Sequence, residues 1–427
     1  MKILQIIPGS GNTFYCENCL RDDGLVRTLG AMGHDAAGLP LYLPLMSDEP
    51  EALDDAPVFF GGINVYLQQK FGLFRRTPRW IDRLFDSPRL LRWAARRSGM
   101  TRATDLGETM LSMLRGEHGR QVKELERLVD YLVAHDPPDV VCLSNALLLG
   151  LAERIQQALR VPVVCMLQDE DAFVDALPEA LREQVWSVLG ERAGQADAFV
   201  AVSRYYADVM RRRLALPADR VHVVHTGIAV DRWPARAGPP EAPTIGYLSR
   251  LCPAKGLDLL VEAFEALRAG GAPEGLKLRV AGGWTDGDLP FIDGVRRRLS
   301  EAHLADDVEL LGNLDADDRR AFLGGLSVLS VPTRAGEAFG LYVVEALACG
   351  VPVVLPRHGS FVELVETTGG GLLVEPNDPA ALADAIGQLL ADPARAAALG
   401  AAGRRAVAEK FSAEGMARAF LRVCQLP

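Results

Sequence analysis

The chain has 427 residues, 49% of them hydrophobic, which is enough for roughly two to three domains with sizeable cores. Its formal net charge of −10 argues against general nucleic-acid binding, because such proteins present a basic surface. No run of about 18 apolar residues occurs, so we expect no transmembrane helix. The seven cysteines are odd in number and scattered, which favours a reducing, cytoplasmic location over a disulfide framework.

Short apolar runs alternate with helical patterns through the first half of the chain. The opening residues, MKILQIIPG, are too short a run for a secretory signal and indicate a first strand at 2–7. Strands that alternate with helices imply a parallel sheet covered on both faces. The other predicted strands lie at 140–143, 161–167 and 199–202, and the helices at 21–33, 119–134 and 149–159.

The second half repeats this α/β pattern. Residues 234–243 (PARAGPPEAP) lack apolar periodicity and indicate a linker between two domains. Asp378 followed by Pro379 is typical of a helix start, and helices should fill the chain from 380 onward. The other predicted elements are a helix at 256–268 and strands at 244–248, 277–281, 308–311, 328–331 and 351–355.

These patterns predict two domains with a cleft between them. The predicted limits are 1–234 for the first domain, 235–243 for the linker, 244–410 for the second domain and 411–427 for a helix that crosses back. In open parallel sheets, ligands bind outside the carboxyl ends of the strands. The loops expected at the site are those that follow Ile7, Leu167, Leu248, Ala281 and Val331.

Two cations, Arg250 and Lys255, flank the loop between a predicted strand and a predicted helix. Arg offers a planar fork of donors and Lys a compact point charge, and both suit phosphate oxygens. The same charges would stabilise a departing diphosphate. The alternative is that both are ordinary solvated surface cations, but their place after a strand favours a phosphate site.

Two acids, Glu337 and Glu345, lie eight positions apart in the segment 334–352, RAGEAFGLYVVEALACGVP. The first falls in a loop after a predicted strand and the second in the early turns of a helix. Such a unit directs backbone N–H groups and a positive helix end at an anion, while a carboxylate can accept hydrogen bonds from sugar hydroxyls. The alternative is a solvated loop acid and an exposed helix face. The combination favours a nucleotide-sugar site.

The motifs YLSRLCPAKGLDLLVEAF and EAFGLYVVEALACGVPVV resemble those of retaining glycosyltransferases of family 4. The segments MKILQIIPG, LGAMGHD, ADAFVAVSRYYADVM, VHVVHTGIAVDRW and GLLVEPNDPAALADAI are similar to that family in order and spacing. The resemblance covers nearly the whole chain. It implies the GT-B fold, in which two Rossmann-like domains face a central cleft.

The resemblance also implies residue roles. Arg250 and Lys255 would grip the donor diphosphate, Glu337 would contact the sugar hydroxyls, and Glu345 would contact the ribose. Arg250, Lys255 and Glu337 are therefore the predicted catalytic residues. Backbone contacts to the sugar and phosphate would come from Phe339, Gly340 and Leu341. Similar enzymes work without a metal or cofactor and retain the configuration of the sugar, with the nucleotide diphosphate sugar as co-substrate.

The chain departs from the family pattern at three places. Instead of adjacent glycines, the first loop carries Gly9 and Gly11, the expected donor contacts after the first strand. Many members have a histidine where this chain has Gln168 and Asp169, which are the predicted acceptor-side residues although Gln168 cannot shuttle a proton. Residues 226–228 read Thr-Gly-Ile where the family commonly has an Asn-Gly pair.

A single CxxC pair, Cys16 and Cys19, lies after the first strand. Zinc would need two more ligands at sensible spacing, and His34, the only histidine nearby, follows a predicted helix. We expect these cysteines to pack within a loop and predict no metal site, with metal binding or redox chemistry as the alternative.

The segment 71–102 differs from the rest of the chain because it holds nine Arg and only two Asp. It begins a predicted helical insertion at about 71–118. Trp80, Ile81, Leu84 and Phe85 recur at helical spacing within it. The favoured interpretation is a helical insertion packed on the first domain. The alternative is a basic amphipathic surface that contacts the inner face of a membrane or an anionic acceptor.

These observations predict a retaining hexosyltransferase that moves a sugar from a UDP- or GDP-sugar to a hydroxyl on a saccharide, lipid or small-molecule acceptor. Closure about 234–243 would bring Gly9 and Gly11 over the phosphates and exclude water. One rival keeps the fold and changes the reaction to sugar epimerisation or phosphorolysis. The other is a binding protein that retains the donor site without catalysis.

Overall fold

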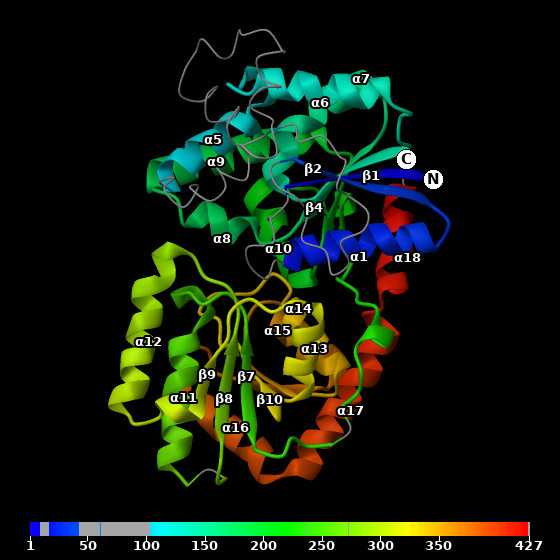
Figure 1. Ribbon diagram of the computed structural model, residues 1–427. Coiled ribbons are helices and arrows are strands. Elements are labelled where there is room, and N and C mark those ends of the chain that lie inside the picture. The colour runs from blue at the N-terminus through cyan, green and yellow to red at the C-terminus, as the bar shows by residue number, and fades with distance from the viewer. Residues whose placement is uncertain (9–16, 42–59, 61–102, 237, 272, 426–427) are drawn as a thin grey trace. The chain divides into compact units, whose positions relative to one another are not determined.

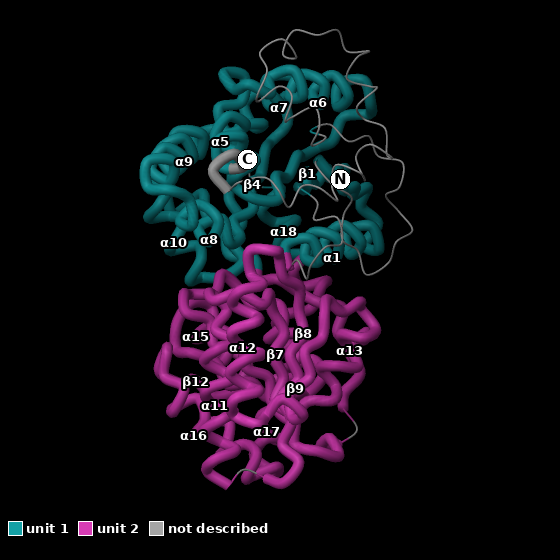
Figure 2. Tube along the Cα trace, turned by 60° about the vertical axis from the view of Figure 1, so that its left-hand side comes forward, with its two compact units in different colours: residues 1–12, 18–224, 417–427 teal, residues 13–17, 225–416 magenta. Residues whose placement is uncertain are grey.

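The computed structural model describes residues 1–8, 17–41, 60, 103–236, 238–271 and 273–425. Gly9, Gly11, Cys16 and the basic segment 71–102 lie outside the described residues. The chain forms two compact units, coloured separately in Figure 2. Unit 1 contains Met1–Asn12, Asn18–Val224 and Ala417–Pro427, and unit 2 contains Thr13–Glu17 and His225–Met416.

Unit 1 is built on a parallel six-stranded sheet with the order β2-β1-β3-β4-β5-β6. Its central strands are fully apolar because both faces are covered, and all side chains of β3, β4 and β5 are buried. The strands are β1 (Lys2–Ile7), β2 (Asp35–Pro40), β3 (Val140–Leu143), β4 (Val163–Leu167), β5 (Ala198–Ala201) and β6 (Val221–Val223).

The helices of unit 1 cover this sheet (Figure 1). Helix α10 begins where Ser203 Oγ accepts a hydrogen bond from Tyr206 N (3.0 Å), which satisfies one of the free N–H groups of its first turn. Helices α6 and α7 pack against each other, and Arg154 Nε of α7 donates to Glu126 Oε1 of α6 (2.7 Å). The helices are α1 (Glu17–Ala31), α5 (Ala103–Leu114), α6 (Val122–Ala134), α7 (Ala152–Leu159), α8 (Glu170–Asp175), α9 (Glu179–Arg192) and α10 (Arg204–Leu214).

Unit 2 is built on a second parallel six-stranded sheet, with the order β12-β11-β10-β7-β8-β9. Strand β7 lies between β10 and β8, so the loops that follow these three strands meet at one edge of the sheet. The strands are β7 (Thr244–Leu248), β8 (Lys277–Ala281), β9 (Val308–Leu310), β10 (Val328–Leu329), β11 (Val353–Pro356) and β12 (Gly371–Val374).

Helix α14 (Leu341–Ala348) is the most deeply buried helix described in unit 2, because all eight of its residues are buried. It packs against α17, and α11 packs against α16. The other helices are α11 (Leu257–Ala269), α12 (Leu289–Glu301), α13 (Ala316–Gly324), α15 (Ser360–Thr368), α16 (Pro379–Ala391) and α17 (Pro393–Lys410), followed by α18 (Ala413–Cys424), which begins in unit 2 and continues into unit 1.

The predicted α/β fold class is confirmed, since both units are parallel sheets covered by helices. The apolar runs at 140–143, 244–248 and 277–281 form strands with the predicted limits. The sequence analysis did not predict three strands, β2, β6 and β12. Each lies at an edge of its sheet and is only partly buried, so its apolar run is weak.

The division between the units falls between Val224 and His225, about ten residues before the predicted linker. Residues 234–243 belong to unit 2, where Arg236 N donates to Cys349 O (3.0 Å) and Arg236 Nη1 to Leu326 O (2.9 Å). Helix α18 starts in unit 2, and the residues from Ala417 onward group with unit 1.

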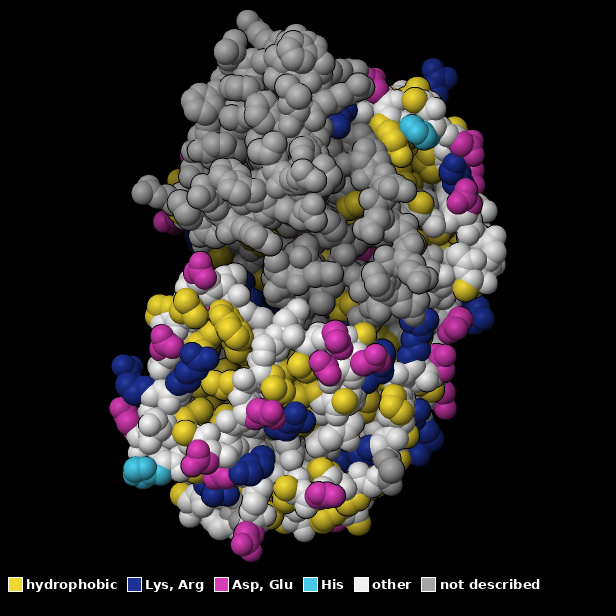
Figure 3. Space-filling view, in the orientation of Figure 1, with side chains coloured by type: hydrophobic (Ala, Val, Ile, Leu, Met, Phe, Trp, Pro, Cys, Tyr) yellow, Lys and Arg dark blue, Asp and Glu magenta, His cyan; other side chains and the backbone are white. Residues whose placement is uncertain are grey.

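Acidic and basic side chains are interspersed over the described face in Figure 3. Arg298 of α12, for example, donates to Glu262 (2.6 Å) and Glu265 (2.8 Å) of α11. Among the helices that the structure describes, none has the length and apolar character needed to cross a membrane.

Candidate functional site

The loop between β7 and α11 carries both predicted phosphate-binding cations, Arg250 and Lys255. It is held from within the unit by Tyr247, whose buried hydroxyl donates to Arg250 O (3.0 Å). Gly256 closes the loop with φ +71°, and a Cβ there would lie 1.9 Å from Pro332 O, so only glycine fits. The backbone that positions both cations is therefore fixed by the core of unit 2.

The Arg250 side chain is oriented by Asp288, an acid that the sequence analysis did not single out. Its Nε and Nη2 donate to Asp288 Oδ2 (3.2 and 2.9 Å), and Nη2 also donates to Thr285 Oγ1 (3.2 Å). Asp288 Oδ2 in turn accepts from Thr285 N (2.8 Å) and Thr285 Oγ1 (2.7 Å). The Arg250 side chain is 45% exposed, so it can reach a ligand while one edge of its guanidinium stays anchored.

The charge state of Asp288 follows from these contacts. Burial acts to raise the pKa of this carboxyl, but the hydrogen bonds from Thr285 and Arg250 outweigh burial and lower the pKa below its usual range. Asp288 is therefore an ionised partner for Arg250. A sequence signal existed, because Thr285 and Asp288 have the spacing of a capping box directly after β8.

Lys255 and Glu337 are brought together although 82 positions separate them. Lys255 Nζ donates to Glu337 Oε1 (2.9 Å) and Oε2 (2.7 Å). Tyr342 Oη donates to Glu337 Oε2 (2.9 Å). Glu337 is only 5% exposed, which makes these charge-assisted bonds stronger than they would be in water. The predicted phosphate cation and the predicted sugar acid thus lie in direct contact.

The loop that carries Glu337 is clamped by the start of α15. Ser360 N donates to Glu337 O (3.0 Å), and Ser360 Oγ donates to Phe339 O (2.7 Å). A Cβ on Gly359 would lie 2.5 Å from Glu337 N, so the two backbones approach closely. Gly340 begins α14 with φ +85°. Phe339 and Leu341, the other predicted backbone contacts, are buried.

Glu345 is placed differently from Glu337. It lies within α14, is 1% exposed, and forms an ion pair with Arg319 Nε of α13 (3.3 Å). The Arg319 guanidinium also lies over the Trp233 ring, 5.7 Å from its centroid. Glu345 therefore has a buried cationic partner inside unit 2, and its predicted contact with a ribose stays a prediction.

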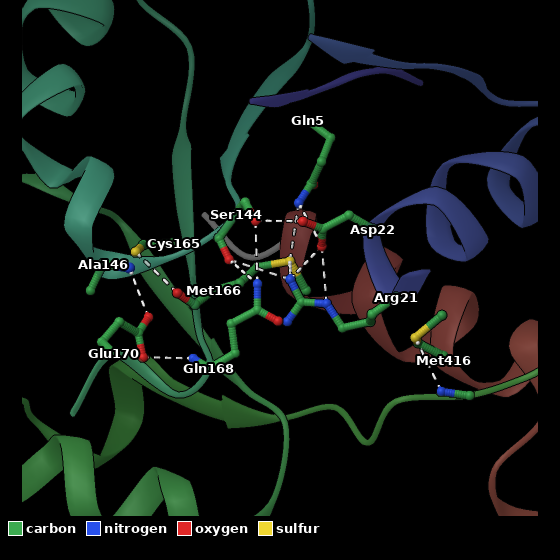
Figure 4. Close-up of polar contacts among 11 residues, drawn as sticks. Gln5, Arg21, Asp22, Ser144, Ala146, Cys165, Met166, Gln168, Glu170 and Met416 are labelled. Carbon is green, nitrogen blue, oxygen red and sulfur yellow. Dashed lines mark hydrogen bonds and ion pairs between the residues drawn. The ribbon is translucent and has the colours of Figure 1, made fainter. Parts of the chain in front are cut away.

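The two predicted acceptor-side residues lie after β4 in unit 1. The Gln168 side chain is 2% exposed and points into a buried polar cluster, where its Nε2 donates to Ser144 O (2.6 Å) and Ser144 Oγ (3.2 Å) (Figure 4). Arg21 and Asp22 of α1 belong to the same cluster. Asp169 has φ +62° and precedes α8. The carboxamide of Gln168 is thus engaged by its own unit.

Glu170 occupies the next position and is a buried acid that the sequence analysis did not single out. Its Oε1 accepts from Ala146 N (2.8 Å), and its Oε2 accepts from Gln168 N (2.7 Å) and Tyr206 Oη (2.7 Å). Burial raises the pKa of this carboxyl even though the hydrogen bonds act in the opposite direction. Glu170 joins the loops that follow β3 and β4.

The described residues contain no group of three or more His, Cys, Asp or Glu side chains arranged to hold a metal ion. Cys19 is buried in α1. Its predicted partner Cys16 lies outside the described residues, so the role of the CxxC pair stays a prediction.

Comparison with known proteins gives matches along most of the chain. The family model described as glycosyl transferases group 1 matches residues 231–406, and the model described as glycosyltransferase family 4 matches residues 106–232. A GDP-mannose-dependent alpha-(1-6)-phosphatidylinositol monomannoside mannosyltransferase from Mycobacterium tuberculosis is 31% identical over 306 residues, which cover 67% of this chain and 75% of that protein. The chain belongs to the group 1 glycosyltransferases of family 4.

Two further relatives match shorter stretches. The corresponding mannosyltransferase of Mycolicibacterium smegmatis is 35% identical over 49% of this chain, and a D-inositol 3-phosphate glycosyltransferase from Xylanimonas cellulosilytica is 32% identical over 58%. The matched regions span 57% and 61% of these two relatives. The residues of the Lys255–Glu337 contact, with Asp288 and Tyr342, all lie inside the segment 231–406 that matches the group 1 model.

Solved structures of the same fold support the GT-B assignment. A sucrose-phosphate synthase from Thermosynechococcus elongatus aligns with a TM-score of 0.69 at 20% identity and covers 99% of this chain and 98% of its own. The Anabaena protein HepE in complex with UDP and glucose aligns with a TM-score of 0.68 at 17% identity over the full length of both chains. At these identities the likeness shows the fold alone.

Proposed function

We propose that this family member is a retaining hexosyltransferase that moves a hexosyl group from a nucleotide diphosphate sugar to a hydroxyl acceptor. The contact between Lys255 and Glu337 carries the proposal. It joins a group suited to phosphate oxygens with a group suited to sugar hydroxyls, at the place where a sugar–phosphate bond would be broken. Membership of a glycosyltransferase family supports the same reaction class.

In this proposal the two cations stabilise the leaving nucleoside diphosphate. The Arg250 guanidinium and the Lys255 ammonium donate to the phosphate oxygens, where negative charge grows as the glycosidic bond breaks. Glu337 accepts hydrogen bonds from sugar hydroxyls and orients the ring. The family resemblance implies that this chemistry proceeds without a bound metal and with retention at the anomeric carbon.

We further propose a UDP- or GDP-linked sugar as donor and a lipid or polyol hydroxyl as acceptor. A relative named as GDP-mannose-dependent, and a neighbour solved with UDP and glucose, support these two donor classes. A relative named as a phosphatidylinositol mannoside mannosyltransferase supports a lipid acceptor. Contact with the inner face of a membrane, the alternative interpretation of the basic segment 71–102, would then bring enzyme and acceptor together.

The first experiment is a donor panel with GDP-mannose, UDP-glucose and related sugars, scored by release of nucleoside diphosphate with and without acceptor extracts. We expect slow hydrolysis of one donor alone and faster, acceptor-dependent release. Lys255→Ala should lower the release by about 100- to 1000-fold. Lys277→Ala is the matched control, because Lys277 pairs with Asp307 in the same unit and has no part in the proposed site.

Near-normal release by Lys255→Ala would refute the assignment of the site. Steady conversion of the donor without release of nucleoside diphosphate would indicate an epimerase instead. Binding of a donor by calorimetry, with no release under any condition, would indicate a non-catalytic nucleotide-sugar-binding protein.

A further inference from the structure

Tyr342 is a buried phenol in direct contact with the acid of the proposed site. It is the second residue of α14, its side chain is 0% exposed, and its Oη lies 2.9 Å from Glu337 Oε2. Its ring packs edge-on against Phe361 of α15, with centroids 6.4 Å apart at 64°. Because the ring is enclosed by the core, the hydroxyl has a fixed position and a fixed acceptor.

The two oxygens of Glu337 do not have the same partners. Oε2 accepts from both Tyr342 Oη (2.9 Å) and Lys255 Nζ (2.7 Å), whereas Oε1 accepts from Lys255 Nζ (2.9 Å). An incoming diphosphate competes for the Lys255 ammonium, because phosphate oxygens are strong acceptors for Lys. If Lys255 donated to a phosphate, Tyr342 would still hold Oε2, and Oε1 would become available to a sugar hydroxyl.

We propose that Tyr342 is a positioning residue for the transfer reaction, one whose hydroxyl anchors Glu337 Oε2 so that Oε1 is presented to a hydroxyl of the donor sugar. The inference rests on the proposed function of Glu337. It assigns Tyr342 no contact with the substrate, since its side chain is buried beneath the carboxylate.

The protonation state of Tyr342 suits this role. Burial and the nearby Glu337 charge raise the pKa of the phenol well above its usual value of 10.0. The phenol therefore remains a hydrogen-bond donor throughout the pH range of an activity assay. Tyr247, a buried tyrosine of the loop that carries Arg250, donates to a backbone carbonyl instead, so it does not hold Glu337.

The test is Tyr342→Phe in the full chain, which keeps the ring and removes only the hydroxyl. Loss of a hydrogen bond to a charged group should lower kcat by about 10- to 100-fold. Binding of GDP or UDP, the diphosphates without sugar, should change by less than about 2-fold, because Arg250 and Lys255 are unchanged. Tyr342→Phe combined with Glu337→Gln should add little to Glu337→Gln alone, because Tyr342 acts through Glu337.

The matched control is Thr368→Val. Thr368 Oγ1 donates to Leu364 O (2.7 Å) in α15, so this variant also removes a buried hydroxyl from unit 2. We expect it to lower the unfolding temperature and leave kcat unchanged. A wild-type kcat in Tyr342→Phe would overturn the proposal, and so would an equal loss of kcat and GDP or UDP binding that tracks a loss of folded protein.

Failure of the proposed function can be told apart from failure of this inference. If the wild-type chain transfers no sugar, binding of intact GDP-mannose and UDP-glucose is compared with binding of GDP and UDP by calorimetry. Positioning by Tyr342 predicts that Tyr342→Phe weakens only the sugar-linked ligand. Equal binding of that ligand by both proteins would overturn the inference whether or not transfer occurs.

Discussion

Glu170 of unit 1 and Glu337 of unit 2 are both buried acids that accept a hydrogen bond from a buried tyrosine. Their remaining partners differ. Glu170 accepts from the backbone N–H groups of Ala146 and Gln168, which are fixed in the fold. Glu337 accepts from the Lys255 ammonium, which ends a flexible side chain and, in the proposed reaction, transfers its bonds to a phosphate. Burial alone therefore does not distinguish a site from a structural acid, whereas an exchangeable partner does.

The largest expected effect separates these two acids by activity. Glu337→Gln should lower kcat by about 100- to 1000-fold, because the neutral amide cannot accept from the sugar with the strength of a carboxylate. The folded state should survive. Acceptor-dependent release of nucleoside diphosphate measures the activity, and circular dichroism measures the fold. Full activity of Glu337→Gln would show that Glu337, like Glu170, has no part in the reaction.

A smaller effect is expected at Asp288, the acid that aims Arg250. Asp288→Asn should weaken the binding of GDP or UDP by about 10-fold, because the guanidinium loses its ionised anchor. Asp293→Asn serves as control, since Asp293 is exposed and pairs with Arg296 on the surface of α12. Calorimetry measures both variants, and equal affinities would show that Arg250 needs no anchor.

Glu170→Gln should affect stability rather than activity. The amide places an NH₂ group among donors that faced a carboxylate, so we expect a loss of about 1–3 kcal/mol in the free energy of unfolding. The kcat of the folded fraction should stay within about 3-fold of the wild type. Chemical denaturation and a donor assay on the same sample test this pair of outcomes. A lost kcat with unchanged stability would move Glu170 into the functional site.

The smallest expected effect concerns how the free energy of unfolding depends on pH. Glu170 and Asp288 should contribute to this dependence in opposite directions. The pKa of Glu170 is raised in the folded state, so its contribution to stability is fully present below the usual value of 4.5 and is lost as pH rises through the folded value. The pKa of Asp288 is lowered, so its contribution is present above the usual value of 3.8 and is lost as pH falls.

These two opposite pH dependences of stability can be measured by chemical denaturation at several pH values between about 3 and 7. The stability difference between wild type and Glu170→Gln should shrink as pH rises. The difference between wild type and Asp288→Asn should grow over the same range. Parallel curves for the two variants would contradict the assigned directions of both pKa shifts.

Much of the fold could be predicted because apolar runs and loop chemistry are local signals. Strands β3, β4 and β11 are continuous apolar segments, and the helix start at Asp378 was visible as a cap followed by proline. The edge strands β2, β6 and β12 carry weaker runs, since partial burial relaxes the demand for apolar residues. The family resemblance supplied the GT-B arrangement, which no local pattern contains.

The site was predictable in part for the same reason. Lys255 and Glu337 each follow a strand of a parallel sheet, so their meeting at one sheet edge was foreseeable. The pairing of Glu345 with Arg319, and the inward direction of Gln168, depend on which helix or loop packs opposite them. Asp288 had a sequence signal in its spacing from Thr285. Tyr342 had none, because its neighbours in sequence are equally apolar and only the tertiary structure places its hydroxyl on Glu337.

Helix α14 is a rigid element that takes part in two charged contacts. Its first turn carries Tyr342, which holds Glu337, and its second carries Glu345, which pairs with Arg319. Every residue of the helix is buried in a close-packed core. A substitution that moves one end of the helix should therefore also move the other end. A substitution that shifts the helix would therefore move the hydroxyl that holds Glu337 and the carboxylate that pairs with Arg319 together.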